Sequence, residues 1–194
     1  MSDKKTSPAA QAVHPYADLS SARKILLVAT TFCSYMLFAV AWNWGDIYVT
    51  SLGFSASRTA MMTNAITLAQ VLGSLVAANI IVKLETRNAY TLAGALIIFG
   101  GVVSLTQAFP LVFFIRFVRG LGGALMVVMG SAIAAKVLTG RDLQVANGIN
   151  SVAFNTGLAV AMTFGVRVFG RPVLGVLVAA SLSVMLLVVW LVIS

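Results

Sequence analysis

Two arginines, Arg116 and Arg119, lie inside a long apolar stretch of this sequence. Their spacing of three residues places both guanidinium groups on about the same face of a helix. An arginine inside a membrane-spanning helix costs at least about 2.5 kcal/mol on insertion scales unless water or an acid meets it. The pair therefore indicates a water-filled cavity or a buried polar network. Arginines that only lock helices together are the structural alternative.

Asp46 is the acidic candidate for the same cavity, and it follows the segment Trp42-Asn43-Trp44 in another apolar stretch. Such a carboxylate either faces a cavity, where it can titrate or pair with a cation, or lies at a helix end and reaches the membrane surface. Asn43 and Asn64 are further candidates for lining the cavity, although Asn64 has the alternative of bonding to neighbouring helices. The tryptophans have a simpler explanation in the aromatic belt at membrane surfaces.

Residues suited to catalysis are almost absent from the sequence. His14 is the only histidine and lies in the polar N-terminal segment, while Cys33, the only cysteine, cannot form a disulfide within the chain. Asp46 and Glu85 are separate acids, so no carboxylate pair, metal cluster or nucleophile with its base can be assembled. We therefore expect no enzyme activity, no metal site and no cofactor.

The composition identifies the elements that must position these residues. The chain of 194 residues is 60% hydrophobic and 9% charged, with a mean hydropathy of +0.99, which leaves too little polar surface for a soluble domain. A membrane-spanning helix needs roughly 20 apolar residues. Because lipid cannot hydrogen-bond to the backbone, the sequence predicts an all-α membrane protein. We expect six transmembrane helices over residues 25–49, 57–82, 90–108, 111–138, 144–166 and 172–193.

The distribution of Lys and Arg predicts the orientation, because cytoplasmic loops carry the excess of positive charge. Eight basic residues lie before the first span or in the second and fourth connections: Lys4, Lys5, Arg23, Lys24, Lys83, Arg87, Lys136 and Arg141. The other connections contain three: Arg58, Arg167 and Arg171. Both termini are therefore expected in the cytoplasm.

The predicted domains are a polar cytoplasmic tail, residues 1–24, and a membrane domain, residues 25–194. The net charge of +8 reflects topology, because the basic residues are dispersed at helix ends rather than clustered on one face. No nucleic acid is expected as a partner. Short loops and the absence of a presequence favour the bacterial inner membrane over an organellar membrane.

The segment Arg116-Phe-Val-Arg119-Gly120-Leu-Gly122-Gly123-Ala124 resembles the fourth-helix signature of major facilitator superfamily (MFS) transporters. That signature reads roughly Arg, two residues, Gln or Arg, Gly, any residue, Gly, any residue, Ala. Its place in the fourth predicted span strengthens the resemblance. The small residues Gly120, Gly122 and Gly123 would let a neighbouring helix approach closely.

Two other superfamily motifs are only partly present. The connection between helices two and three usually reads Gly-x-x-x-Asp-Arg-x-Gly-Arg-Arg, whereas this chain keeps the basic residues Lys83 and Arg87, lacks the Asp and both glycines, and offers Glu85 as a partial substitute. The resemblance implies that these three residues form a cytoplasmic loop gate. In the fifth span, Gly157 and Gly165 match the outer glycines of an exporter motif whose central Gly-Pro is missing, so an antiporter assignment is unsupported. Both glycines are predicted to serve helix packing.

The resemblance implies that the chain is an N-terminal six-helix half built from two inverted three-helix repeats, with the first and fourth helices lining the cavity. Those helices contain Asp46 and the arginine pair. A complete superfamily member has twelve spans, so a second six-helix half is an expected partner. The sequence leaves open a fragment, a half-transporter with a separate partner, and a parallel homodimer.

The implied function is transmembrane secondary transport of a small solute by alternating access, and coupling to protons is left open. Arg116 would be the central charge, Arg119 its companion and Asp46 the proton or cation partner. The alternative is a non-transporting membrane scaffold, sensor or assembly protein derived from a transporter, which would tolerate the altered loop motif.

Overall fold

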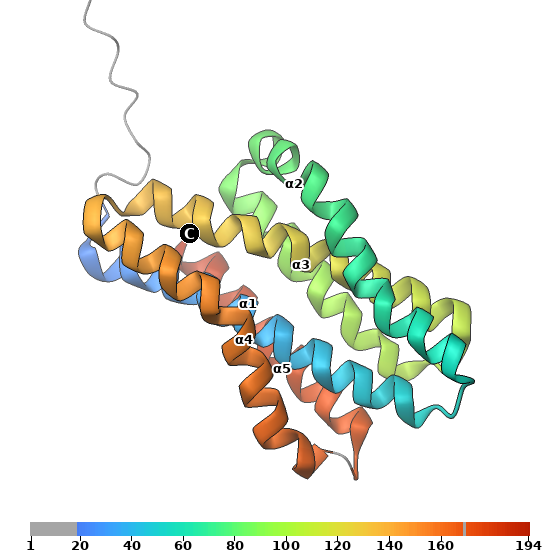
Figure 1. Cartoon of the computed structure of the whole chain (residues 1–194). Coiled ribbons are helices and arrows are strands. Elements are labelled where there is room, and N and C mark those ends of the chain that lie inside the picture. The colour runs from blue at the N-terminus through green and yellow to red at the C-terminus, as the bar shows by residue number, and fades with distance from the viewer. Residues whose placement is uncertain (1–18, 169) are drawn as a thin grey trace, which may run out of the picture.

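The computed structural model describes residues 19–168 and 170–194, and this part of the chain consists of helices joined by short connections, without strands (Figure 1). The predicted tail, with His14, lies almost entirely outside the described residues, and the side chain of Arg167 is also outside them. The elements are α1 (Ser21–Ser51), α2 (Ala56–Phe99), the 3-10 helix η1 (Gly100–Leu105), α3 (Phe109–Val137), α4 (Gly140–Val168) and α5 (Pro172–Ile193).

Helix starts follow local sequence signals. The Ser20 hydroxyl accepts a hydrogen bond from the backbone N–H of Arg23 and caps α1, which therefore begins four residues before the predicted span. Prolines stand in the first turns of α3 and α5, where a helix needs no backbone donor. These signals fix where each long helix enters the bundle.

The described residues form five α-helices, whereas the sequence predicted six. The predicted spans 57–82 and 90–108 belong to α2 and η1, and the loop expected between them is reduced to a break at Glu85, where φ is 61° and ψ is 166°. The segment around this break contains neither glycine nor proline, so helical residues continue on both sides of it. α2 therefore consists of two helical segments that meet at a kink at Glu85, and six separate helices stay a prediction.

Four helical segments of the described chain are long and apolar enough to cross a membrane, judged by length and composition: Ser21–Ser51, Ala56–Leu105, Phe109–Val137 and Pro172–Ile193. The second has 50 residues and contains two of the predicted spans. α4 has 29 residues, includes Asn147, Asn150 and Asn155, and is not among the four. A span at 144–166 therefore stays a prediction.

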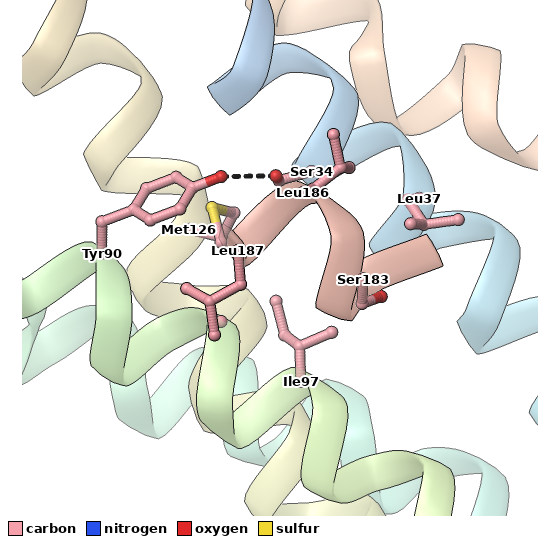
Figure 2. Close-up of a pocket in the computed structure, with 9 residues that line it drawn as sticks. Ser34, Leu37, Tyr90, Ile97, Met126, Ser183, Leu186 and Leu187 are labelled. Carbon is pink, nitrogen blue, oxygen red and sulfur yellow. Dashed lines mark hydrogen bonds between the residues drawn. The ribbon is translucent and has the colours of Figure 1, made fainter. Parts of the chain in front are cut away.

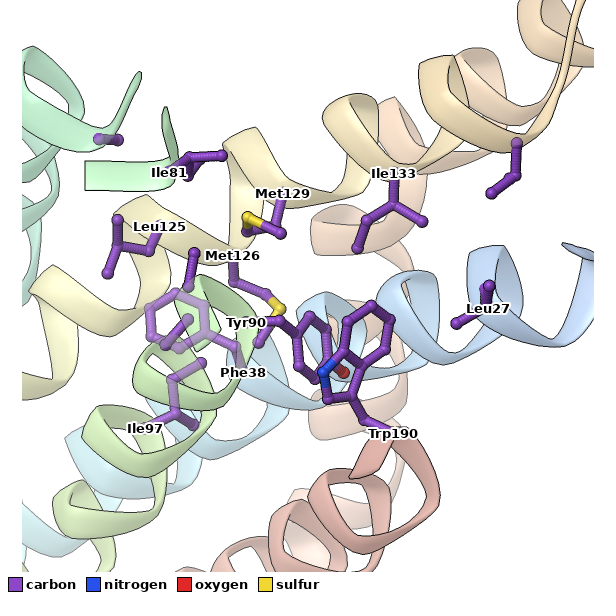
Figure 3. Close-up of a cluster of buried hydrophobic side chains, with 14 of the residues drawn as sticks. Leu27, Phe38, Ile81, Tyr90, Ile97, Leu125, Met126, Met129, Ile133 and Trp190 are labelled. Carbon is purple, nitrogen blue, oxygen red and sulfur yellow. The ribbon is translucent and has the colours of Figure 1, made fainter. Parts of the chain in front are cut away.

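The helices pack in two groups that share a seam. α3 lies along both parts of α2, and α1 lies against α4 and α5, with fewer contacts between α1 and α3 (Figure 1). A cluster of buried hydrophobic side chains joins the two groups. Its members include Phe38 of α1, Tyr90 of α2, Met126 of α3 and Trp190 of α5 (Figure 3). The Tyr90 and Trp190 rings stack with centroids 3.9 Å apart. Such aromatic packing provides a rigid frame for the polar residues.

Basic side chains gather at one end of the bundle. Arg23 Nε donates a hydrogen bond to the carbonyl of Ile193 at 2.7 Å, and an Arg87 guanidinium N–H donates to the carbonyl of Leu191 at 3.3 Å. Lys136 at the end of α3 bonds to the hydroxyl of Thr86 beside the break in α2. These contacts bring together the start of α1, the break in α2 and the ends of α3 and α5, and the two arginines offset the negative end of α5.

Candidate functional site

Arg116 lies on α3 and is 2% exposed. Its Nε donates a hydrogen bond to the carbonyl oxygen of Met62 on α2 at 2.7 Å, and its Nη2 forms an ion pair with a carboxylate oxygen of Asp46 on α1. One guanidinium group therefore links three helices. Asp46 is 29% exposed, so it is the member of the pair that solvent can reach.

Arg119 lies one turn further along α3 and is 3% exposed. Its aliphatic stem fills the space above Gly100, where an added Cβ would lie 2.5 Å from Arg119 Cδ. An added Cβ at Gly45 would lie 2.9 Å from Nη1 of Arg116 and 3.9 Å from Nη1 of Arg119. Both guanidinium groups therefore converge on the Gly45–Asp46 segment of α1, and Arg119 Nε has no hydrogen-bond partner among the described residues.

The cluster of Asp46, Arg116 and Arg119 carries one negative and two positive groups, which leaves one positive charge in excess. A buried charge is costly unless a partner compensates it, and Asp46 pairs directly with Arg116. The positive charge of Arg119 is compensated only by the electrostatic field of the more distant Asp46 carboxylate. The structure therefore brings together three predicted residues in a charged seam between α1 and α3.

The remaining predicted cavity residues do not join this seam. Asn43 is half-buried on α1 and Asn64 is exposed on α2, and neither forms a hydrogen bond with the cluster in the described structure. Trp44, which was open to a surface-belt interpretation, is instead buried, and its indole N–H donates to the carbonyl of Ala161 on α4 at 3.3 Å. It fixes α1 against α4 beside Asp46.

The predicted packing glycines differ in how tightly they are enclosed. A Cβ added at Gly120 would lie 2.5 Å from the carbonyl oxygen of Ile66, and one at Gly122 would lie 2.9 Å from that of Ala93. Gly123 faces the ring of Phe38, and Gly157 faces the backbone of Met36. Gly165 has only ordinary contact, because its nearest neighbour would be 3.8 Å away at Ile47. Four of the five positions thus allow close helix approach.

Hollows that the described residues line lie elsewhere in the structure. A cavity of about 10 Å³ lies beside the hydrogen-bonded hydroxyl groups of Ser34 and Tyr90, with Ser183 and Met126 on its wall (Figure 2). A hollow of about 470 Å³ lies between the start of α1, the end of α3 and the start of α4. Neither is lined by Arg116, Arg119 or Asp46, so the cavity-lining role of these residues stays a prediction.

A comparison with protein-family models matches residues 27–194 to the Major Facilitator Superfamily. The chain belongs to this superfamily. Searches of curated proteins and of solved structures gave no match. Members of the superfamily are membrane transporters of small solutes rather than enzymes. This MFS chain is therefore a multi-pass integral membrane protein that lies in the lipid bilayer.

The three residues predicted to form the loop gate lie beside the break in α2. Lys83 and Glu85 are exposed, while Arg87 is held by its bond to Leu191 and its carbonyl accepts the Trp190 indole N–H at 3.5 Å. Sequence reasoning missed the contact between Thr86 and Lys136 because neither residue carries a recognisable pairing signal. It also missed the hollow at the start of α4, whose walls come from three separate helices.

Proposed function

We propose that this chain moves a small solute across the membrane by alternating access, as one six-helix half of an MFS-type transporter. The single observation that carries this proposal is the ion pair of Asp46 and Arg116, with Arg119 beside it, in the seam between the two packing groups. Ionised residues inside membrane-spanning helices usually belong to a solute or ion pathway. The second half would come from the same kind of chain or from a separate polypeptide.

The ion pair of Asp46 and Arg116 can act as a switch between two arrangements of the helices, because Asp46 can gain or lose a proton. An ionised Asp46 holds α1 to α3 through Arg116, and a protonated Asp46 would lose the charge that makes this bond strong. Because Asp46 is the exposed member, a proton or a cation can reach it without unpacking α3. We therefore assign coupling to Asp46 and the fixed charge to Arg116.

The arrangement of helices supports the internal repeat that this proposal needs. The first predicted repeat corresponds to α1 and the two parts of α2, and the second corresponds to α3, α4 and α5. The first helix of each repeat packs on the other two helices of its partner repeat: α1 contacts α4 and α5, and α3 contacts both parts of α2. Such an exchange is expected of two related repeats. We place the end of the bundle that carries Arg23, Arg87 and Lys136 in the cytoplasm of a bacterial inner membrane.

Flux measurements in vesicles test the proposal. The purified chain is reconstituted in lipid vesicles under an imposed pH gradient, and uptake is measured for radiolabelled organic anions, organic cations, sugars and amino acids. We expect flux of one solute class that Arg116→Ala abolishes and Arg58→Ala leaves unchanged, because Arg58 is exposed and stacks on Phe109. Unchanged flux in Arg116→Ala, with the protein correctly inserted, would contradict the assigned role.

A non-transporting scaffold is the second candidate, and the near-complete burial of Arg116 and Arg119 favours it. Buried arginines can serve helix packing alone. In that case the wild-type chain would move no solute in any class, and Arg116→Ala would lower the melting temperature as its only effect. Cross-linking and native mass measurement would then identify the complex that the helices assemble.

A further inference from the structure

The cavity of about 10 Å³ lies where four helices meet (Figure 2). Its walls include Ser34 from α1, Tyr90 from α2, Met126 from α3 and Ser183 from α5. Ser34 precedes Asp46 by 12 residues on α1, which is about 18 Å along the helix at about 1.5 Å per residue. The cavity is therefore a separate place from the charged seam, and what it holds does not depend on the proposed function.

The size of the cavity matches one water molecule. A buried water in a protein needs roughly 10–15 Å³ of accessible space and two to four polar partners. Part of the cavity surface is polar, and the polar side chains that line it are the hydroxyl groups of Ser34, Tyr90 and Ser183. Leu37 and Ile97 line an apolar part of the wall. A larger solute has no room here, and an apolar occupant could not bond to the hydroxyl groups.

The three hydroxyl groups keep hydrogen-bonding capacity after their bonds within the protein are counted. A serine hydroxyl has one donor hydrogen and two acceptor lone pairs. The Ser183 hydroxyl donates to the carbonyl of Ala179 at 2.8 Å, so its lone pairs remain as acceptors. Ser34 and Tyr90 share one hydrogen bond, and the Tyr90 hydroxyl lies 3.5 Å from the carbonyl oxygen of Thr30, which can accept its hydrogen. The set is rich in acceptors, and a water molecule supplies two donor hydrogens.

We propose that this cavity is a binding site for one water molecule, which donates hydrogen bonds to Ser183 and to the hydroxyl pair of Ser34 and Tyr90. The water joins α5 to α1 and α2. Leu186 and Leu187, the other α5 residues on the wall, are apolar. The water is therefore a polar link within an apolar helix interface, and it fixes the position of α5 at this level.

Radiolytic labelling in lipid nanodiscs detects such a water. An X-ray pulse converts water into hydroxyl radicals, and a radical formed from a bound water oxidises the methionine sulfur beside it even where bulk solvent is excluded. Met126 lines the cavity and is 1% exposed, whereas Met129, one turn further along α3, is 0% exposed and does not line it. We expect Met126 to form sulfoxide about tenfold faster than Met129, measured by mass spectrometry of the peptides.

Matched variants of α5 connect the labelling to the cavity. Ser183→Val removes a hydroxyl partner and adds a methyl group that fills the space, so the oxidation rate of Met126 should fall to that of Met129. Ser181→Val is the control, because the Ser181 hydroxyl also donates to a backbone carbonyl four residues earlier but is exposed and outside the cavity. Met126 should keep its wild-type rate in this control.

An isotope experiment distinguishes a bound water from open access of solvent. The protein is mixed with water that carries the heavy isotope of oxygen shortly before the pulse, and dissolved oxygen is removed. Met61, which is 52% exposed in the first turns of α2, reports bulk water. Because a bound water exchanges more slowly than bulk water, the heavy isotope should appear in the sulfoxide of Met61 first and in that of Met126 later.

Three results would overturn the proposal. Equal oxidation rates of Met126 and Met129 in the wild type would show that the cavity holds no water. An unchanged rate in Ser183→Val would place the source of the radicals elsewhere. Simultaneous appearance of the isotope at Met126 and Met61 would indicate open access of solvent. If Ser183→Val fails to fold, the wild-type comparisons of Met126 with Met129 and with Met61 still decide the question.

Discussion

Asp46 and Arg116 form an ion pair in which the carboxylate is partly exposed and the guanidinium group is buried. Removing the acid alone leaves the buried cation unpaired, which is costlier than removing both groups. We expect Asp46→Asn to destabilise the purified chain by about 3 kcal/mol, and the further change Arg116→Gln to recover about 1–2 kcal/mol of that loss.

The melting temperatures of the wild type, the single variants and the double variant in detergent test this double-mutant cycle. A change of 1 kcal/mol in the free energy of unfolding shifts the melting temperature by about 2–4 °C in a chain of this size. Asp142→Asn is the matched control because Asp142 is exposed on α4 and has no ion pair in the described structure. Additive losses in the double variant would show that the two residues do not interact.

Gly100→Ala should displace Arg119. The new Cβ would lie within 2.9 Å of three stem carbons of Arg119, and the buried side chain has little room to move. We expect a loss of about 1–3 kcal/mol, as for other additions to a well-packed site. Gly148→Ala on α4 is the control, because nothing lies within 4 Å of its added Cβ and alanine is the better helix former. Similar melting temperatures for both variants would refute the tight packing at Gly100.

Tyr90→Phe should cost about 1–2 kcal/mol, because it leaves the Ser34 hydroxyl without its partner in the buried core. Tyr35→Phe is the matched control, since Tyr35 is only partly buried and its ring contacts Phe38 and Phe154 without a hydroxyl partner in the described structure. Melting temperatures compare the two, and Ser34→Ala combined with Tyr90→Phe should be less harmful than Tyr90→Phe alone. If the double variant is the less stable one, the hydroxyl pair contributes nothing.

The sequence was sufficient for the helical membrane class. It also singled out Arg116, Arg119 and Asp46, which lie together in the structure, because a charge inside an apolar stretch is costly to bury and is therefore informative. Their role in a site stays a prediction. The sequence also located the close-packed positions Gly120 and Gly122, since small residues are recognisable without coordinates.

Other features depend on three-dimensional neighbours that one sequence does not reveal. Asn43 and Asn64 were grouped with the cluster by residue type, but Asn43 is half-buried and Asn64 is exposed, whereas Arg116 and Arg119 are buried. The hollow beside Asn150 depends on how three helix ends diverge, and no periodicity records that divergence. The break in α2 was expected as a loop because charged residues suggested one, yet the backbone turns at a single residue.

That residue, Glu85, adopts φ 61° and ψ 166°, a conformation that glycine tolerates and other residues rarely do. Glu85→Gly should therefore relieve strain and raise stability by about 1 kcal/mol. Val82→Gly is the control, since Val82 is exposed, has helical geometry and lies outside the predicted gate, so glycine there should lower stability by up to about 1 kcal/mol. The two variants should shift the melting temperature in opposite directions. A drop in both would mean that the Glu85 side chain contributes more than its backbone costs, as expected if its carboxylate works in the proposed loop gate with Lys83 and Arg87.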